Sequence, residues 1–204
     1  MSNAALVTAE PGTGRTGRKP RPANMSKAAS RSAILEAARR VAARDGARDL
    51  SLRSVAAEAG FAPAGLYGYF RNKDELLLAL AADDLTQLAR AMREAGGFRK
   101  ASAAALNLLR GTETIAAASQ ALPREGGSGD AERLFNGRMI AAMRALSEAG
   151  GLPLDNRESQ CDVVLVAAAL AGLALLERSG RLGALGFQAD EILARLSSRF
   201  AAGR

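Results

Sequence analysis

The 204-residue sequence predicts an all-α protein. From residue 30 onward apolar residues recur at helical spacing, as at Ile34, Ala38, Val41 and Ala42. No stretch of useful length alternates apolar and polar residues as a half-buried strand would. Residues typical of helix starts and stops stand at the ends of the periodic segments. With 48% apolar residues, a chain of this length can bury a sizeable core in one or two domains.

The N-terminal 29 residues predict a disordered basic tail, because Pro and Gly are frequent and apolar periodicity is missing. Residues 12–17 match the pattern G-x-G-x-x-G, but such a phosphate-binding loop must follow a strand and open a helix. Nothing before residue 12 predicts a strand, so we interpret the match as accidental.

The excess of positive over negative charge is confined to the N-terminal third of the chain. Residues 1–73 carry a balance of +8 and residues 74–204 a balance of −1. A basic end joined to a neutral body favours a polyanionic partner for that end. A solvated basic tail without a specific partner would have the same composition.

Three helices are expected in residues 30–73. The first runs from residue 30 to a stop at Gly46, and Ser51 can cap a second, short helix that ends at Gly60. Pro63 begins a third helix that carries Leu66 and Phe70. Two short helices joined by a turn centred on glycine predict a helix-turn-helix.

A long fourth helix is expected to begin after Asn72 and to run to about Ala95. Asn72 and Glu75 form the pattern of a capping box, and two glycines follow Ala95. Later periodic segments predict four more helices, in residues 100–122, 130–149, 155–178 and 189–202.

The composition excludes several classes of catalytic and metal site. Without histidine, the chain cannot hold a Ser-His-Asp or Cys-His system or a two-histidine metal site. The single cysteine, Cys161, can form no internal disulfide. Carboxylates such as Asp83 and Asp84 are interpreted as a solvated helix face. We therefore expect no enzyme activity, no metal and no cofactor.

Neither a membrane span nor secretion is expected. The longest uncharged apolar stretch, residues 163–176, is shorter than the ~20 residues that a transmembrane helix needs. The N-terminus lacks the apolar core of a signal peptide. The expected location is the cytoplasm, in association with a bacterial nucleoid.

Residues 30–77 resemble the DNA-binding signature of the TetR (tetracycline repressor) family. The specific match is the run Gly60, Leu66, Tyr67, Phe70, Lys73, Leu76. The resemblance implies a DNA-binding unit in residues 30–73 and a helical effector-binding and dimerisation domain in residues 74–204. It also implies a ligand-responsive repressor that binds a palindromic operator in double-stranded DNA as a homodimer. The alternative is an all-helical ligand-binding or interaction dimer with a weakened DNA reader.

The resemblance also assigns roles to side chains of the DNA-binding unit. Arg53 would contact a guanine, Tyr67 and Lys73 backbone phosphates, and Tyr69 a phosphate or a base edge. Alternatively, Tyr67 is an aromatic residue at the edge of the core, Lys73 an ordinary exposed lysine, and Arg53 a partner of Asp49 or Glu58. The full set of expected DNA contacts is Ser51, Arg53, Ala62, Pro63, Ala64, Tyr67, Tyr69 and Lys73.

The third helix departs from the family pattern. Ala62 stands where many members have a serine or threonine, so the helix loses a hydroxyl cap. Pro63 and Ala64 carry no side-chain group that could hydrogen-bond a base. Specificity should therefore depend on Arg53, Tyr69, apolar contacts with thymine methyl groups and DNA shape.

The segment of residues 155–178 is apolar on nearly all faces, so one face can meet the chain's own core and another a second subunit. The alternative is a central helix of a monomer, and it is the family resemblance that favours a dimer. By resemblance, the last two long helices form that interface, with candidates Val164, Ala168, Gly172, Leu175, Leu193 and Leu196. An unidentified small-molecule effector would bind inside the body. Its candidate contacts, which could equally be surface or packing positions, are Asn107, Arg110, Thr114, Asn136, Met139, Met143 and Cys161.

Overall fold

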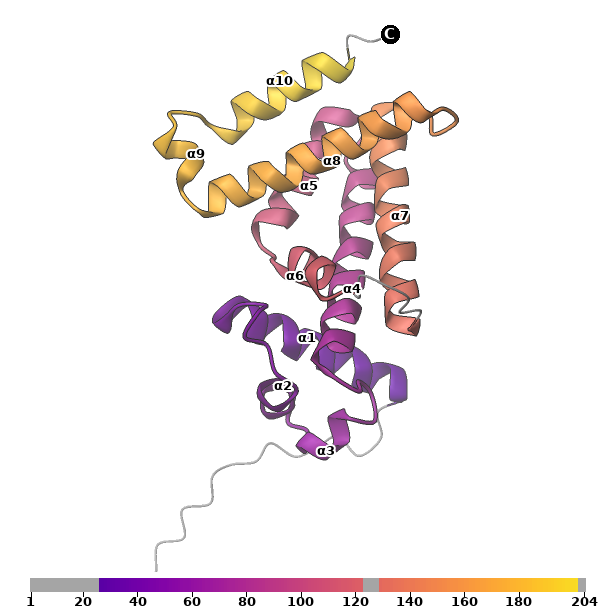
Figure 1. Ribbon diagram of the computed structural model, residues 1–204, viewed down its shortest axis with the longest axis vertical. Helices are drawn as coiled ribbons and strands as arrows, with labels where there is room; N and C mark the ends of the chain where they lie inside the picture. Colours follow the sequence, from indigo (N-terminus) through magenta and orange to yellow (C-terminus); the bar gives the residue numbers. More distant parts are fainter. Residues whose placement is uncertain (1–25, 123–128, 202–204) are drawn as a thin grey trace, which may run out of the picture.

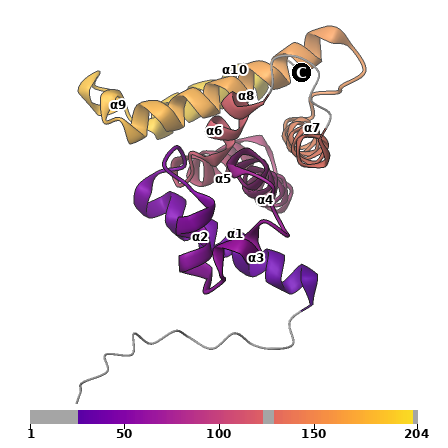
Figure 2. The same ribbon diagram turned by 60° about the horizontal axis from the view of Figure 1, so that its bottom comes forward.

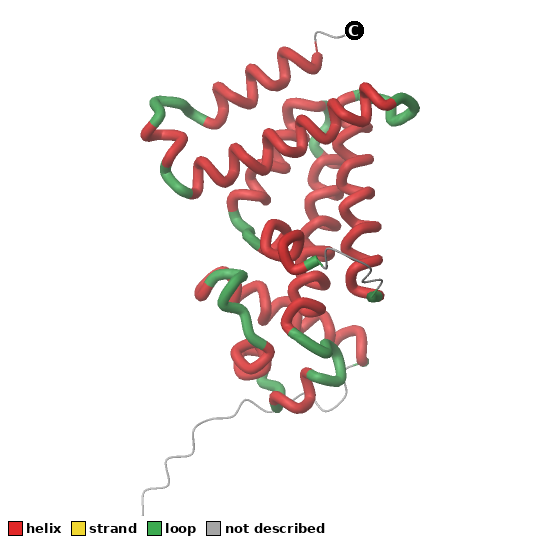
Figure 3. Tube along the Cα trace, viewed as in Figure 1, coloured by secondary structure: helices red, strands yellow, loops and turns green. Residues whose placement is uncertain are grey.

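The computed structural model describes residues 26–122 and 129–201, and every regular element in these ranges is a helix (Figures 1 and 3). The all-α prediction is confirmed. The pattern at residues 12–17 and nearly all of the expected basic tail lie outside the described residues. The helices are α1 Lys27–Asp45, α2 Leu52–Ala59, α3 Pro63–Leu66, α4 Lys73–Glu94, α5 Phe98–Arg110, α6 Thr114–Ala121, α7 Asp130–Gly150, α8 Arg157–Arg178, α9 Arg181–Ala184 and α10 Ala189–Ala201.

Helix α1 begins three residues earlier than expected. The Ser26 side chain accepts a hydrogen bond from the backbone N–H of Ala29 at 3.2 Å and so caps the first turn. Residues 27–29, which were expected in the tail, are therefore helical.

The single helix expected in residues 100–122 is wrong, because the chain turns between α5 and α6. Helix α5 ends at Arg110 with Gly111 as its C-cap, and glycine loses more conformational entropy in a helix than any other residue. The Thr112 hydroxyl then accepts from the N–H of Thr114 at 3.3 Å, a local bond that competes with a helical one. The connection expected in residues 179–187 also contains a short helix, α9.

Helices α1, α2 and α3 and the first turns of α4 enclose a separate hydrophobic core at one end of the molecule (Figure 2). Its largest fully buried side chains include Ile34, Leu66, Phe70 and Leu80. The guanidinium of Arg31 lies 5.1 Å from the centre of the Phe70 ring, which adds a cation–π contact at the edge of this core.

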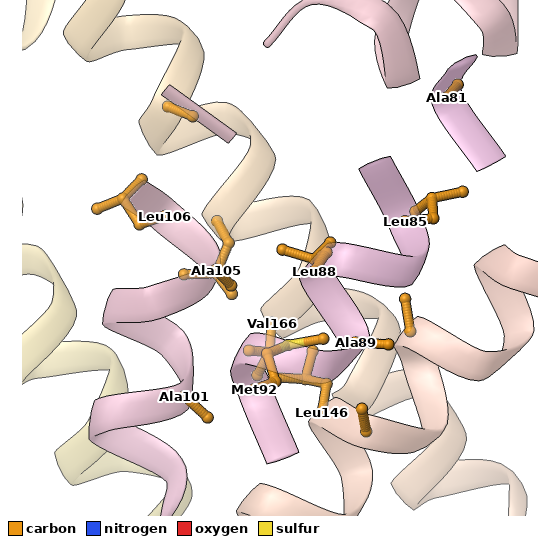
Figure 4. Close-up of a cluster of buried hydrophobic side chains, with 14 of the residues drawn as sticks. Ala81, Leu85, Leu88, Ala89, Met92, Ala101, Ala105, Leu106, Leu146 and Val166 are labelled. Atoms are coloured by element: carbon orange, nitrogen blue, oxygen red, sulfur yellow. The ribbon is translucent and has the colours of Figure 1, made fainter. Parts of the chain in front are cut away.

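The second core lies among α4 and the six helices that follow it, α5 to α10. Leu88 and Met92 of α4 face Ala105, Leu146 and Val166 from three other helices (Figure 4). Small residues such as Ala105 allow close helix packing here. Helix α4 belongs to both cores, because Leu76 and Leu80 contribute to the first and Leu77 and Leu85 to the second.

Helix α8 crosses the body at the end far from α2 and α3 (Figure 1). It is long and apolar enough to cross a membrane by length and composition alone, with a mean hydropathy of 1.9 in its most apolar window. Only 28% of that window is buried inside the chain. Much of its apolar surface is therefore free to meet a partner.

Replacing Leu80 by Ala should lower the free energy of unfolding by about 2–5 kcal/mol, because the side chain is fully buried and leaves a cavity. Urea denaturation of the purified protein measures this loss. Ile140→Ala on α7 is the control, because Ile140 is largely exposed and should cost about 0.5 kcal/mol or less. Similar losses in the two variants would contradict the burial of the first turns of α4 in the core formed with α1, α2 and α3.

Candidate nucleic-acid interface

Helix α2 presents Arg53 on a rigid first turn. The Ser51 side chain accepts from the N–H of Ser54 at 3.0 Å, and the Ser54 hydroxyl accepts from the N–H of Ser51 at 3.2 Å. This reciprocal pair forms a capping box and confirms Ser51 as the cap. Gly60 ends the helix in the left-handed conformation, with φ of 72°.

Arg53 is exposed, and its guanidinium has no hydrogen bond or ion pair with any other described residue. The alternative partner Glu58 is engaged elsewhere, since it accepts from Arg40 at 2.7 Å and from Arg44 at 3.3 Å. These two bonds, that of Arg40 first, lower the pKa of Glu58. The alternative in which Arg53 pairs only with Asp49 or Glu58 therefore has no support in the described part of the chain.

Helix α3 is a single turn and starts without a side-chain cap. Ala62 occupies the cap position and makes no side-chain bond, as the missing hydroxyl predicted. The helix ends at Leu66, so Phe70 lies beyond it rather than within it. Ala62, Pro63 and Ala64 are all exposed on one side of this turn.

The two tyrosines after α3 have different environments. Tyr67 is 56% exposed, and its hydroxyl has no partner among the described residues. Tyr69 is half-buried and packs edge-on against Phe61, with ring centres 6.2 Å apart and planes at 85°. The expectation of separate roles fits this geometry, and the description of a core-edge aromatic applies to Tyr69 rather than to Tyr67.

Lys73 is tied into the protein itself. Its ammonium donates to the backbone carbonyl of Arg48, which lies between α1 and α2. The lysine therefore holds this loop against the start of α4. Any phosphate contact by Lys73 would have to share or replace this bond.

The cap of α4 differs in one detail from the expected box. Asn72 accepts from the N–H of Glu75 at 2.8 Å, but Glu75 accepts from the N–H of Arg71 at 2.8 Å rather than from Asn72. Arg71 is strongly exposed beside this helix start, where the positive end of the helix favours anions. Sequence analysis missed Arg71, although its position directly before the cap was a usable signal.

A polar junction joins α1 and α4 to the turn between α5 and α6. Arg39 of α1 donates to Asp84 at 2.9 and 3.3 Å and to Asp83 at 2.7 Å. Asp84 also accepts from the hydroxyls of Thr112, at 3.2 Å, and Thr114. The side chain of Asp84 is only 10% exposed, so the interpretation of this residue as part of a solvated face was wrong.

The charge of Arg39 is held firmly in this junction. Burial lowers the pKa of its guanidinium. The hydrogen bonds to Asp84 and then Asp83 raise this pKa by more than burial lowers it, so the net shift is upward. Arg39 therefore keeps its positive charge at any ordinary pH.

The comparisons with known proteins agree on one family. The model of the bacterial regulatory proteins of the tetR family matches residues 34–80, which span most of α1, all of α2 and α3 and the start of α4. Residues 34–80 therefore form a DNA-binding region of the tetR type. The HTH-type nicotine-responsive transcriptional repressor HdnoR of Paenarthrobacter nicotinovorans is 45% identical over 62 residues. That match covers 30% of this chain and 32% of the length of HdnoR.

Two solved structures show that the likeness in fold extends over the body as well. A protein of unknown function from Rhodococcus sp. RHA1 has a TM-score of 0.66 at 23% identity, covering 90% of this chain and 98% of that one. BioQ, bound to its natural double-stranded DNA operator, has a TM-score of 0.57 at 22% identity, covering 84% and 98%.

The residues expected to line an effector pocket differ in their exposure and in the elements that carry them. Asn107, Asn136 and Cys161 are exposed, and Met139 and Met143 are half-buried against the second core. Arg110 and Thr114 come together at a groove beside the α5–α6 turn. Within the described ranges, no three Cys, Asp or Glu residues are grouped so as to hold a metal ion.

The residues expected at the dimer interface fall into two sets. Val164, Ala168 and Leu175 are exposed on one stripe of α8, and a Cβ at Gly172 would meet open space. On α10, Leu193 is buried in the chain's own core and Leu196 packs against that core. Leu193 was expected at the interface, and this expectation is corrected by the fold, because its methyl groups already have partners within the subunit.

Asp84→Asn should lower the free energy of unfolding by about 1–3 kcal/mol, because Arg39 and the two threonine hydroxyls lose a charged acceptor. The matched control is Asp83→Asn, whose side chain is 43% exposed and should cost about 0.5 kcal/mol. Denaturant titration measures both. Equal losses would show that Asp84 behaves as a surface carboxylate.

Proposed function

We propose that this protein is a transcriptional repressor that binds a palindromic operator as a homodimer and responds to a small molecule. The observation that supports it best is the exposed face on α2 and after α3, where Arg53 and Tyr67 have no partner among the described residues. Polar side chains left free on a basic, helix-turn-helix end are suited to a polyanion.

DNA binding would divide between positioning and reading contacts. Tyr67, Arg71 and the start of α4 would meet phosphates, which orient the protein without reading sequence. Arg53 would reach a guanine edge in the major groove. Ala62, Pro63 and Ala64 have apolar side chains that cannot hydrogen-bond a base. The remaining sources of specificity would be apolar contacts with thymine methyl groups and the shape of the DNA.

A second copy of the chain would cover the exposed stripe of α8. Val164, Ala168, Gly172 and Leu175 follow a helical spacing of three to four residues and lie on the face turned away from the core. Two copies related by a two-fold axis would present two DNA readers to a palindrome. Burial against a partner also accounts for the apolar character of α8 in a cytoplasmic, nucleoid-associated protein.

Response to a small molecule is supported by the family and by the name of HdnoR, a nicotine-responsive repressor. Because the match spans only a third of HdnoR, nicotine itself is not proposed as the effector here. The deciding experiment is selection of bound fragments from random DNA at about 0.15 M salt. A recovered palindrome supports the proposal, and recovery of unrelated sequences would instead support a weakened DNA reader.

Arg53→Ala should weaken binding to the selected palindrome by about 1–3 kcal/mol and leave binding to scrambled DNA nearly unchanged, because the lost contact is to a base. Lys73→Ala should weaken both DNAs to a similar degree. Fluorescence anisotropy titrations with each DNA measure these changes. Arg90→Ala, on an exposed part of α4 in the body, is the charge-matched control. If Arg53→Ala weakens both DNAs equally, the base-reading role is wrong.

Leu175→Glu should convert the dimer to a monomer at micromolar concentration, because the new carboxylate would be buried without a partner. Sedimentation velocity measures the change in mass. Ile140→Glu introduces the same charge at a similarly exposed residue of α7, away from the stripe, and should leave the dimer intact. A dimeric Leu175→Glu variant would argue against the α8 interface.

A further inference from the structure

A groove opens where the C-terminal end of α1 faces the α5–α6 turn and the end of α8. We call it the junction groove, and its volume is about 270 Å³. Ala42 and Ala43 of α1 and Ala47 just after it contribute apolar surface to the lining. Arg110, the last residue of α5, and Arg178, the last residue of α8, also line the groove.

The lining of the junction groove is rich in positive charge. Arg39, Arg110 and Arg178 line it, against a single lining carboxylate, Glu113, which accepts a hydrogen bond from Arg178. Asp84 and Glu177, which pair with Arg39 and Arg110, are not among the lining residues. Since each arginine has a carboxylate partner, an anion in the groove would depend on the N–H donors that these ion pairs leave free.

Arg110 and Arg178 keep donors for a ligand. Arg110 donates to Glu177 and to Asn107, and Arg178 donates to Glu113 and to the carbonyl of Thr112. A guanidinium has five N–H donors, and the hydrogen bonds among the described residues use two on each. Both side chains can thus hold their present partners and still donate to a bound carboxylate.

Size and chemistry together define the ligand class. A cavity of about 150 Å³ holds one benzene ring, so 270 Å³ is enough for an acid with one or two rings but too little for a long acyl chain. The alanine methyl groups offer contact to an apolar ligand body, and the arginines offer charge-assisted bonds to its acid group.

We propose that the junction groove binds a small organic carboxylate and that its occupancy changes the affinity for DNA. The regulatory part rests on the proposed function. One wall belongs to the DNA-reading end and the other to the body, so a ligand that contacts both favours one orientation of the two. Arg39, which lines the groove, also donates to Asp84 in the junction that joins these parts.

The site is tested on the purified full-length protein without DNA. Sodium benzoate and sodium naphthalene-2-carboxylate are titrated by calorimetry at constant ionic strength, each against its neutral amide. We expect saturable binding of at least one acid and at least tenfold weaker binding of its amide. No saturable binding of either acid, or equal binding of acid and amide, would overturn the proposal.

A matched pair of variants locates the binding. Ala43→Leu fills the groove from an exposed helical position without disturbing an ion pair, and should weaken acid binding at least tenfold. Ala116→Leu places the same side chain on the exposed face of α6, outside the groove, and should bind as the unchanged protein does. Circular dichroism checks that both variants fold. Unchanged affinity in Ala43→Leu would place the acid elsewhere and refute the site.

The regulatory part is tested by DNA titration with and without the bound acid. Operator affinity should change at least threefold in the unchanged protein and not in Ala43→Leu. No change at saturating acid overturns the regulatory part while the calorimetric result stands. Failure to bind DNA both with and without the acid would instead contradict the proposed function, so the two failures are distinguishable.

Discussion

The position of the DNA-reading end relative to the body depends on α4, because opposite faces of this one helix are buried in two separate cores. Leu76 and Leu80 pack with α1, α2 and α3, whereas Leu77 and Leu85 pack with the body. A helix of 22 residues is stiff over this length, so a shift of its body half is carried to its reading half. Packing at both ends leaves little freedom to slip, since buried side chains interdigitate closely.

The polar junction fixes the relative orientation of the two parts that α4 connects. Arg39, Asp84 and the threonines of the α5–α6 turn satisfy one another at the point where the two cores meet. Hydrogen bonds of this kind require specific geometry, whereas apolar contacts tolerate small rotations. The junction therefore selects one orientation among those that the two cores would allow, and the junction groove lies directly beside it.

The exposed surface around α2 and α3 and the exposed stripe of α8 share one property. Each carries groups that have no partner among the described residues of a single subunit. Arg53 and Tyr67 have unengaged polar groups at one end, and Val164 and Leu175 expose apolar surface at the other. The proposed sites for a polyanion and for a second copy lie at opposite ends of the molecule (Figure 1). The region between them, where a ligand would act, is the part that couples the two.

Local rules allowed the sequence by itself to determine most of the long helices, the caps of α2 and α4 and the helix-turn-helix. Ser51, Gly60 and Asn72 act through bonds to residues within four positions, so their roles could be predicted without the fold. The family resemblance rested on the same short segment. The break after α5 was missed because a glycine and two threonines are weak signals beside a long apolar period.

Only the tertiary structure decided which side chains meet across helices. Asp83 and Asp84 are adjacent and alike in sequence, yet one is solvated and the other is buried against α1 and the α5–α6 turn. Leu193 and Val164 are both apolar residues on amphipathic or apolar helices, yet one fills the core and the other faces outward. The helical period gives the angle between two residues around one helix, but it does not show which side of the helix faces a neighbouring helix. That choice depends on the packing of segments far apart in the chain, which also creates the junction groove.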